Sequence, residues 1–362
     1  MQSVKWLHPR QLLKIFAASS IALFLLGFSN SFSIAEYRDR EVETHLPVTP
    51  QFVPLFYSLE KYAQNTVSGG PGKDGIPAID TPRFVSAGRA ESFLGPEDIV
   101  FGVVLNDEVK AYPQKILVWH EIVNDRLGHE NVSVTYCPLT GTAIGFKRGE
   151  TTFGVSGRLV NNNLIMYDRA TDSRWPQILG TAVSGSFKGK SLEEFRVIWT
   201  AWGRWKQRYP ETEVLSENTG YIRNYQRDPY GSYHPLGGYY AEGSPPLFPV
   251  LHRDRRFDPK AVVLGARTRD GVVAFKKNSL RAKKIMEGTL SGKQYIAFYD
   301  PVLDTGYIYK NPERKLFVYE NGQYTNADGK WEAGDLPLEK VNAFDAMWFA
   351  WAAFYPETDA YE

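Results

Sequence analysis

The sequence VFGVVLNDEVKAY at residues 100–112 returns in altered form as VLGARTRDGVVAF at residues 263–275. The likeness extends beyond these segments. Residues 100–147 align with residues 263–310 without a gap, at an offset of 163 positions, and 12 of the 48 aligned pairs are identical. The shared residues are mostly Gly, Pro, aromatic and aliphatic, the types that specify turns and cores. We therefore predict two tandem pseudo-repeats of one fold.

Past residue 147 the likeness continues at a shorter offset of 146 positions, where Trp202 and Trp205 match Trp348 and Trp351. The reactive residues, in contrast, are confined to the first copy. His120, Glu121 and Cys137 of the first copy correspond to Lys283, Lys284 and Asp300 of the second. The two copies share the residues that form the fold, but only the first copy has these reactive groups. We therefore predict that the functional site lies in the first copy.

Local patterns predict mostly β-structure in the first copy. Residues 99–105 and 108–112 read as a hairpin around the turn Asn106-Asp107. Residues 114–125 have an apolar stripe at helical spacing, which predicts a helix with His120, Glu121 and Asn124 on its other face. The other expected elements are strands at 132–136, 152–160 and 163–168, a turn at 138–141 and a helix at 199–208. The predicted fold class is α+β, mostly antiparallel β-sheet with a few helices.

Composition and the repeat divide the chain into five segments. They are a signal peptide or N-terminal membrane anchor (1–35), a linker and lead-in (36–81), repeat one with the polar site (82–215), a connection rich in Tyr, Gly and Pro (216–258), and repeat two, a degenerate structural copy (259–362). The many aromatic residues of the connection indicate a loop that packs onto the domains rather than a disordered linker.

The N-terminal segment predicts export. Lys5, Arg10 and Lys14 precede an uncharged stretch at 15–35, whose most apolar part is 14 residues long. That length suits a signal peptide better than a membrane span of ~20 residues, and the small residues before Ala35 suit cleavage there. An uncleaved anchor is the alternative. In both cases the expected location is periplasmic or extracellular, with membrane contact only through this segment.

Charge and cysteine content limit the function classes. The formal net charge is +1, and it becomes −2 without residues 1–35, which carry three positive charges and no negative one. This balance gives no support for nucleic-acid binding through bulk electrostatics. The hydrophobic content of 43% and the aromatic content of 14% indicate well-packed cores. Cys137 is the single cysteine, so the chain forms no intramolecular disulfide.

Six motifs occur in a fixed order along the chain. They are WHEIVND at 119–125, TYCPLTGT at 135–142, FGVSG at 153–157, MYDR at 166–169, YQRDPY at 225–230 and FPV at 248–250. In these motifs the chain resembles the prokaryotic domain-of-unknown-function family numbered 3179 (DUF 3179), from about residue 76 to residue 361. The resemblance implies a family identity and no particular activity. The family pattern commonly has a second Cys at the position of Thr140, so this chain lacks a Cys-x-x-Cys pair.

A thiol near basic and acidic groups predicts nucleophilic catalysis at Cys137. A thiol needs a base or a cation nearby to ionise at neutral pH, and His120 or Arg169 is the candidate, with Glu121 or Asp168 orienting the imidazole. We predict His120, Glu121 and Cys137 as catalytic residues. The predicted substrate-binding residues are Asn124, Asp125, Tyr136, Thr140, Asp168 and Arg169.

Three alternatives stay open beside an envelope enzyme that acts on a small organic substrate. The first is a non-catalytic ligand-binding or structural envelope protein, which the abundant aromatic residues permit. The second is a copper or zinc protein, with candidate ligands among His120, Glu121, His129, Cys137 and Met166. The third is thiol exchange with another molecule, because one cysteine cannot run a two-thiol cycle alone. The sequence leaves the cofactor and the oligomeric state unknown.

Overall fold

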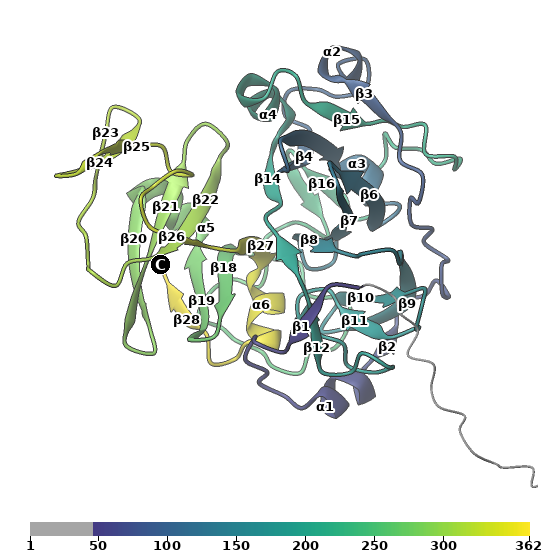
Figure 1. Ribbon diagram of the computed structural model, residues 1–362. Helices are drawn as coiled ribbons and strands as arrows, with labels where there is room; N and C mark the ends of the chain where they lie inside the picture. The colour runs from purple at the N-terminus through teal and green to yellow at the C-terminus, as the bar shows by residue number, and fades with distance from the viewer. Residues whose placement is uncertain (1–45) are drawn as a thin grey trace, which may run out of the picture. The chain divides into compact units, whose positions relative to one another are not determined.

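Strands outnumber helices in the computed structural model, which describes residues 46–362 (Figure 1). Most strand pairs within this range are antiparallel. The predicted α+β class with mostly antiparallel sheet is therefore confirmed. The predicted signal peptide or anchor, residues 1–35, lies outside the described residues. No helix within 46–362 has the length and apolar character needed to cross a membrane.

Repeat one is built on two sheets. The first contains β3 (Phe84–Ser86), β4 (Ile99–Leu105), β5 (Glu108–Pro113), β14 (Ile198–Ala201) and β15 (Glu213–Leu215), in the spatial order β14-β4-β5-β15-β3. The second contains β6 (Ile122–Leu127), β7 (Glu130–Cys137), β8 (Thr142–Lys147) and β13 (Glu194–Phe195), in the order β13-β8-β7-β6.

Repeat two has two sheets with corresponding orders. The first contains β18 (Val262–Thr268), β19 (Gly271–Lys276), β27 (Ala343–Met347) and β28 (Asp359–Tyr361), in the order β27-β18-β19-β28. The second contains β20 (Ile285–Leu290), β21 (Lys293–Asp300), β22 (Thr305–Lys310) and β26 (Glu339–Val341), in the order β20-β21-β22-β26. One pair in each first sheet is parallel: β15 with β5 in repeat one and β28 with β19 in repeat two. These orders agree with the internal likeness of the sequence; the tandem duplication itself stays a prediction.

The two repeats also share one packing contact. In repeat one, helix α4 (Trp202–Arg208) places Trp205 over Gly102, where a Cβ would overlap the indole ring. Trp205 Nε1 donates to Thr212 Oγ1 at 3.0 Å. Helix α6 (Trp348–Phe354) repeats this contact in repeat two with Gly265, Trp351 and Thr358. A glycine is therefore required at this point of each central strand because the ring occupies the space of a side chain.

Further elements surround the repeats. A third sheet contains β2 (Val67–Ser68), β9 (Phe153–Val160), β10 (Asn163–Asp168) and β11 (Arg174–Pro176), and smaller pairings join β1 (Val48–Pro50) to β12 (Lys190–Leu192) and β16 (Gly231–Tyr233) to β17 (Leu236–Gly238). The strands β23 (Val318–Glu320), β24 (Gln323–Asn326) and β25 (Gly329–Trp331) form a small sheet in repeat two. The other helices are short: α1 (Leu59–Gln64), α2 (Ala87–Ala90), α3 (Gln114–Leu117) and α5 (Lys277–Lys283).

The predicted helix at 114–125 is wrong beyond its first turn. Only α3 is helical, and the chain then turns into strand β6, which pairs with β7 over six residue pairs. Glu121 has φ +59°, which is incompatible with continuing a helix. The β-branched pair Ile122-Val123 suits a buried strand, and cross-strand pairing overrides the helical spacing of the apolar residues. The predicted hairpin β4–β5 and the strands β7, β9 and β10 are confirmed.

Buried polar contacts join the two repeats. Glu194 of β13 forms an ion pair with Arg267 of β18, and both side chains are almost fully buried. Arg196 donates to the carbonyl of Ala343 and, at 3.1 Å, to Thr305 Oγ1. The repeats also share a hydrophobic cluster that contains all of helix α6 except Ala353. Residues of repeat two therefore contribute to the surroundings of the predicted site.

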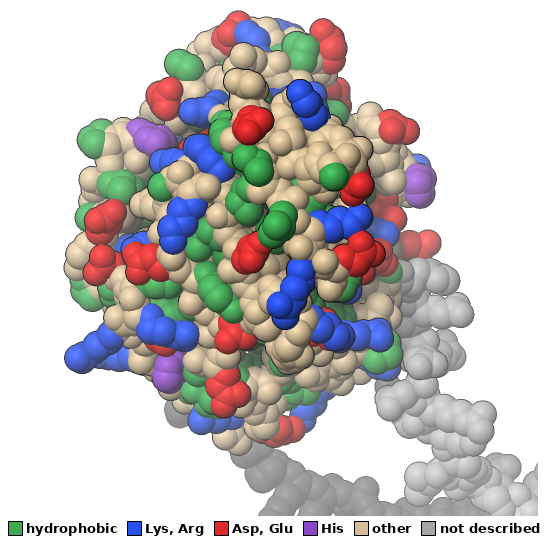
Figure 2. All heavy atoms as spheres, turned by 90° about the vertical axis from the view of Figure 1, so that its left-hand side faces the viewer, with side chains coloured by type: hydrophobic (Ala, Val, Ile, Leu, Met, Phe, Trp, Pro, Cys, Tyr) green, Lys and Arg blue, Asp and Glu red, His purple; other side chains and the backbone are tan. Residues whose placement is uncertain are grey.

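The surface carries mixed charges. Figure 2 shows basic and acidic side chains interspersed over one face of the molecule, with hydrophobic side chains between them. No extended region of a single sign is visible on this face. Such a surface offers no broad field to attract a polyanion there.

Candidate functional site

Cys137 ends strand β7 and is buried, with 1% of its surface exposed. Its Sγ lies 3.6 Å from the carbonyl oxygen of Asn162, and the backbone N–H of Leu164 donates to Sγ at 3.4 Å. Burial and then the charge of Glu121 raise the pKa of the Cys137 thiol to about 11. The sulfur is therefore a protonated thiol at neutral pH in this conformation.

A fully buried hydrogen-bond network fixes the turn after Cys137. Thr140 Oγ1 lies 2.8 Å from Thr142 Oγ1 and accepts from Asn163 Nδ2 at 3.1 Å. Thr142 Oγ1 donates to Gln177 Oε1 at 2.6 Å. Thr140, predicted to bind substrate, is thus engaged in holding the turn, and its carbonyl accepts from the N–H of Met347 in repeat two at 2.9 Å.

Glu121 lies across the hairpin from Tyr136, the residue before Cys137, because its carbonyl accepts from the N–H of Tyr136 at 2.7 Å. The side chain is 5% exposed, and its carboxyl forms no hydrogen bond with another of the described residues. Burial raises the pKa of the Glu121 carboxyl to about 8. The left-handed backbone at Glu121 recurs at Lys284, the corresponding residue of repeat two, so that conformation belongs to the hairpin rather than to the chemistry.

His120 lies next to Glu121 but faces other groups. Nδ1 lies 2.7 Å from the carbonyl oxygen of Pro77, which only accepts, so Nδ1 carries the proton and donates. Nε2 lies 2.7 Å from the hydroxyl of Tyr225. Burial lowers the pKa of His120 to about 4 despite the hydrogen bond to Pro77, so the ring is neutral and Nε2 accepts from Tyr225. Both ring nitrogens are occupied, and neither contacts Cys137 by a hydrogen bond.

Lys260 brings an amine from repeat two to the thiol. It is 4% exposed, and among the described residues its Nζ has no hydrogen-bond partner. The Nζ lies 3.0 Å from the ring centre of Tyr239 and 5.0 Å from that of Phe349. Burial lowers the pKa of the Lys260 ammonium to about 7, and its interaction with Cys137 opposes this shift. A buried amine that is half protonated near neutral pH thus lies within electrostatic range of the sulfur.

The connection covers this group of side chains. Tyr225, Tyr239 and Tyr240 are buried, as expected for an aromatic loop that packs onto the domains. The hydroxyl of Tyr239 donates to the carbonyl of Leu139 at 2.7 Å, one turn away from the thiol. Burial, then the charges of Glu121 and of Cys137, raise the pKa of Tyr230. Tyr230 and Tyr239 therefore close the thiol off from solvent.

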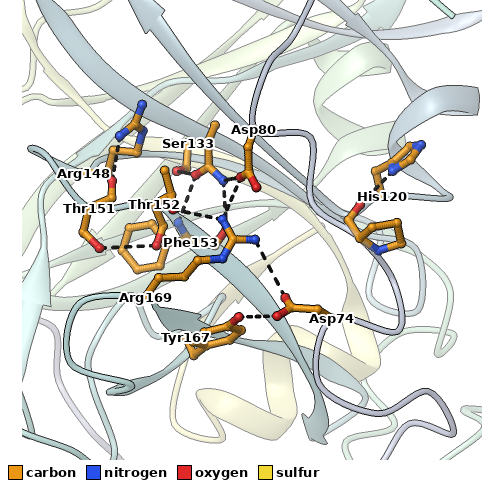
Figure 3. Close-up of polar contacts among 12 residues, drawn as sticks. Asp74, Asp80, His120, Ser133, Arg148, Thr151, Thr152, Phe153, Tyr167 and Arg169 are labelled. Carbon is orange, nitrogen blue, oxygen red and sulfur yellow. Dashed lines mark hydrogen bonds and ion pairs between the residues drawn. The ribbon is translucent and has the colours of Figure 1, made fainter. Parts of the chain in front are cut away.

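Arg169 belongs to a separate polar cluster (Figure 3), and hydrogen bonds join Asn124 to it. Asn124 Nδ2 donates to Asp80 Oδ1 at 2.6 Å and to the carbonyl of Phe153 at 2.8 Å. Its Oδ1 accepts from Ser133 Oγ at 2.7 Å. Arg169 Nη1 donates to the same Asp80 oxygen at 2.8 Å. In Figure 3 His120 lies apart from this cluster, which joins strands β6 and β9 to the lead-in rather than to the thiol.

The two predicted aspartates have buried partners of their own. Asp125 accepts from Lys110 Nζ at 3.1 Å and from the hydroxyl of Tyr112 at 2.7 Å. Asp168 accepts from Trp175 Nε1 at 3.0 Å and closes the turn that follows it. Satisfied buried groups of this kind stabilise a fold. The structure brings neither aspartate into contact with Cys137.

Tyr136 points to the opposite side of strand β7. Its hydroxyl lies 3.1 Å from that of Tyr233 and accepts from Gln114 Nε2 at 3.3 Å. Tyr233 belongs to the connection. The structure thus brings Glu121 and Thr140 to Cys137, and it joins Asn124 and Arg169 through Asp80. A metal site does not emerge: within residues 46–362 no group of three His, Cys, Asp or Glu side chains is arranged to hold an ion.

A family comparison agrees with the motifs. The family model described as "Protein of unknown function (DUF3179)" matches residues 73–358. This chain belongs to the DUF3179 family. The DUF3179 match spans both repeats and the connection, so the residues of the thiol cluster all lie inside it. No curated protein and no solved structure matches the chain.

Sequence reasoning missed Lys260, Tyr230 and Tyr239. Tyr230 is the last residue of the motif YQRDPY, one of the six motifs that carry the family resemblance. That motif lies in the connection, so it was a sequence signal for a role of the connection at the site. Lys260 had no such signal, because it precedes strand β18 in a segment without a motif. Only the three-dimensional fold joins it to Cys137.

Proposed function

We propose that this DUF3179 protein is an enzyme that acts on a small organic substrate, with Cys137 as its nucleophile, Glu121 as a proton donor and Lys260 as the base. One observation carries the proposal. The buried thiol of Cys137 interacts electrostatically with the buried carboxyl of Glu121 and with the buried amine of Lys260, and among the described residues the carboxyl and the amine form no hydrogen bond. A fold built for stability alone pairs such groups or replaces them by apolar ones.

The free-energy cost of burying these groups supports a functional role for them. Burying a charged carboxylate or ammonium without a partner is unfavourable by several kcal/mol, so both groups shift their pKa values toward the neutral form. The pKa of Glu121 rises to about 8 and that of Lys260 falls to about 7. Values near neutral pH suit groups that exchange protons in a reaction, and such shifts cluster at functional sites.

Each group has a defined task in the proposed reaction. The neutral amine of Lys260 takes the proton of the thiol, and the resulting ammonium stabilises the thiolate. The thiolate forms a bond to an electrophilic carbon of the substrate, while the bond from that carbon to the leaving group breaks. The protonated carboxyl of Glu121 gives its proton to the leaving group. In the second half, the Glu121 carboxylate takes a proton from water, whose oxygen bonds to the carbon as the carbon–sulfur bond breaks. The Lys260 ammonium returns its proton to the departing sulfur, which restores the thiol, the carboxyl and the amine.

The resting site is neutral and closed, so the proposal includes an opening step. Burial is the main cause of the raised thiol pKa and of the lowered amine pKa. Access of water or of a polar substrate moves both values toward their ordinary range and favours the thiolate–ammonium pair. The residues that block access are Tyr230 and Tyr239 of the connection. We also place the protein outside the cytoplasm, on the N-terminal sequence pattern alone.

The first test is alkylation of the only cysteine by iodoacetamide between pH 6 and pH 10, followed by intact mass. The alkylation rate of each variant is divided by the rate of the same variant at pH 10. This ratio removes differences between variants in how often the connection opens over Cys137. We expect Lys260→Met to shift the profile to higher pH, because a cation beside the thiolate is lost. We expect Glu121→Gln to raise the normalised rate around pH 8 to 9, where the native carboxylate opposes the thiolate. Lys283→Met, at an exposed lysine, is the matched control.

The second test asks for turnover. We expect p-nitrophenyl acetate to give a burst of p-nitrophenol equal to the protein concentration, with an acetyl group on Cys137, and no burst from Cys137→Ser. Identical alkylation profiles for all variants would make Cys137 a core residue and overturn the proposal. Shifted profiles without acylation by this ester or by a thioester would favour the ligand-binding alternative instead.

A further inference from the structure

A second feature of the fold, separate from the thiol, is a cavity of about 300 Å³ between the two repeats. Its walls come from positions that the sequence offsets pair with one another: Ile99 with Val262, Trp199 with Asp345, and Ala201 with Met347. The cavity therefore lies where equivalent edges of the two first sheets face each other. Neither Cys137 nor Lys260 lines it.

The wall from repeat one and the connection is apolar and aromatic. Trp199 and Tyr233 line it with their ring centres 5.3 Å apart and nearly perpendicular. Both rings are partly exposed, and Leu236 and Ile99 extend the apolar surface. Such a wall suits a flat ring, which aromatic side chains contact through stacked or edge-on geometry.

The wall from repeat two is polar, but its charges are paired internally. Lys277 Nζ lies 2.5 Å from Asp345 Oδ2, with both side chains nearly buried. Arg281 forms two hydrogen bonds with Asp304, at 2.9 and 2.6 Å. These pairs leave no net charge on this wall. They hold a polar surface in place opposite the aromatic one.

Arg204 of helix α4 is a lining residue whose positive charge is not paired with a carboxylate of another described residue. Its Nη1 donates to the carbonyl oxygens of Pro301 and Val302, at 2.8 and 3.2 Å. Among residues 46–362 no carboxylate pairs with this guanidinium, so its Nε and Nη2 remain free to donate. Asn278, another lining residue, likewise has an amide without a hydrogen-bond partner in the described part of the chain. The opposing charge is Glu97, an exposed residue of the lining.

We propose that this inter-repeat cavity binds a small organic anion that carries a ring. The ring lies against Trp199 and Tyr233, and the acidic group accepts hydrogen bonds from Arg204. The volume is at the small end of the range of ligand pockets, which fits a single ring with a short acidic chain. Guanidinium and carboxylate form the strongest of the available polar contacts, because the two planar groups match in geometry.

The cavity also has a structural link to the predicted substrate-binding residue Tyr136. The hydroxyl of Tyr233 in the cavity wall lies 3.1 Å from that of Tyr136, which directly precedes Cys137. Gly141 of the turn after Cys137 also belongs to the lining. Binding in the cavity rests on none of the thiol cluster, so it is tested independently of the proposed reaction.

The test uses 1-anilinonaphthalene-8-sulfonate, whose fluorescence rises in apolar surroundings, and its displacement from the full-length protein. The competitors are 3-phenylpropionate, 3-phenylpropylamine and 3-phenylpropanol, which share a ring and differ in charge. We expect the carboxylate to compete at a concentration at least tenfold lower than the amine or the alcohol. Equal competition by all three, or preference for the amine, overturns the assignment of an anion.

Variants locate the binding. We expect Arg204→Gln to weaken the binding of 3-phenylpropionate at least tenfold and to leave the binding of 3-phenylpropanol unchanged. Arg208→Gln, on the same helix but outside the lining, should change the binding of neither compound. Val262→Phe fills the cavity and should abolish displacement, with Val318→Phe, on exposed strand β23, as its control. Cys137→Ser should bind as the native protein does. Retained binding in both Arg204→Gln and Val262→Phe would show that the probe lies elsewhere.

Discussion

The Nε2 of His120 accepts a hydrogen bond of 2.7 Å from the hydroxyl of Tyr225, and this contact fastens the connection to repeat one. Tyr225 in turn lies 2.6 Å from Thr219 Oγ1, within the same connection. His120 directly precedes Glu121, so the fastening point lies beside the thiol cluster. The neutral imidazole thus holds the connection in this structure, and its role as a base stays a prediction.

Tyr225→Phe should loosen the connection without unfolding the protein. The change leaves the buried Nε2 without a donor, which is unfavourable by about 1–3 kcal/mol. We expect faster hydrogen exchange of residues 221–233 and faster alkylation of Cys137. Tyr221→Phe is the control, because the hydroxyl of Tyr221 forms no hydrogen bond with other described residues. Unchanged exchange in Tyr225→Phe would show that the contact does not fasten the connection.

Glu121→Gln should change how stability depends on pH. The native pKa of about 8 lies above the ordinary value of 4.5, so the folded state binds the proton more tightly than the unfolded state. Stability contributed by this proton is complete below pH 4.5 and is lost as the pH rises to 8, by on the order of 5 kcal/mol. Urea unfolding of the variant should lack this loss. Glu287→Gln, at an exposed position, should show the same loss of stability with rising pH as the native protein.

Gly102→Ala and Gly265→Ala should destabilise the protein by similar amounts. Each new Cβ overlaps an indole ring, of Trp205 or Trp351, and overpacking of this kind is unfavourable by about 1–3 kcal/mol. Thermal unfolding measures the effect. Gly88→Ala has open space around the new Cβ and should be neutral or stabilising. A large effect in one repeat and none in the other would count against equivalent packing.

Glu194→Gln should weaken the joint between the repeats. Glu194 pairs with Arg267, and removing one partner leaves an uncompensated buried charge, which is unfavourable by about 3–5 kcal/mol. Glu339→Gln breaks the exposed pair with Lys310 and should change stability by less than about 1 kcal/mol. Chemical denaturation compares the two. Equal small effects would mean that the buried pair contributes little to the joint.

Local signals predicted the strands well and the site only in part. The hairpin β4–β5 followed from its turn residues, and β7 from its β-branched residues. The helix expected at 114–125 failed because strand pairing of Ile122-Val123 with β7 is a tertiary effect that spacing does not reveal. Glu121 and Cys137 meet because one hairpin joins them. His120 and Tyr225 are 105 residues apart, and Lys260 lies in the other repeat, so no local pattern links them to the site.

The placement of Lys260 makes the two halves unequal and mutually dependent. The half that holds the thiol lacks the amine, and the half that holds the amine has Asp300 where the other has its thiol. A gene cut between the repeats would therefore yield two fragments of which neither carries the whole set. In the proposed reaction, repeat two therefore supplies a group that repeat one lacks.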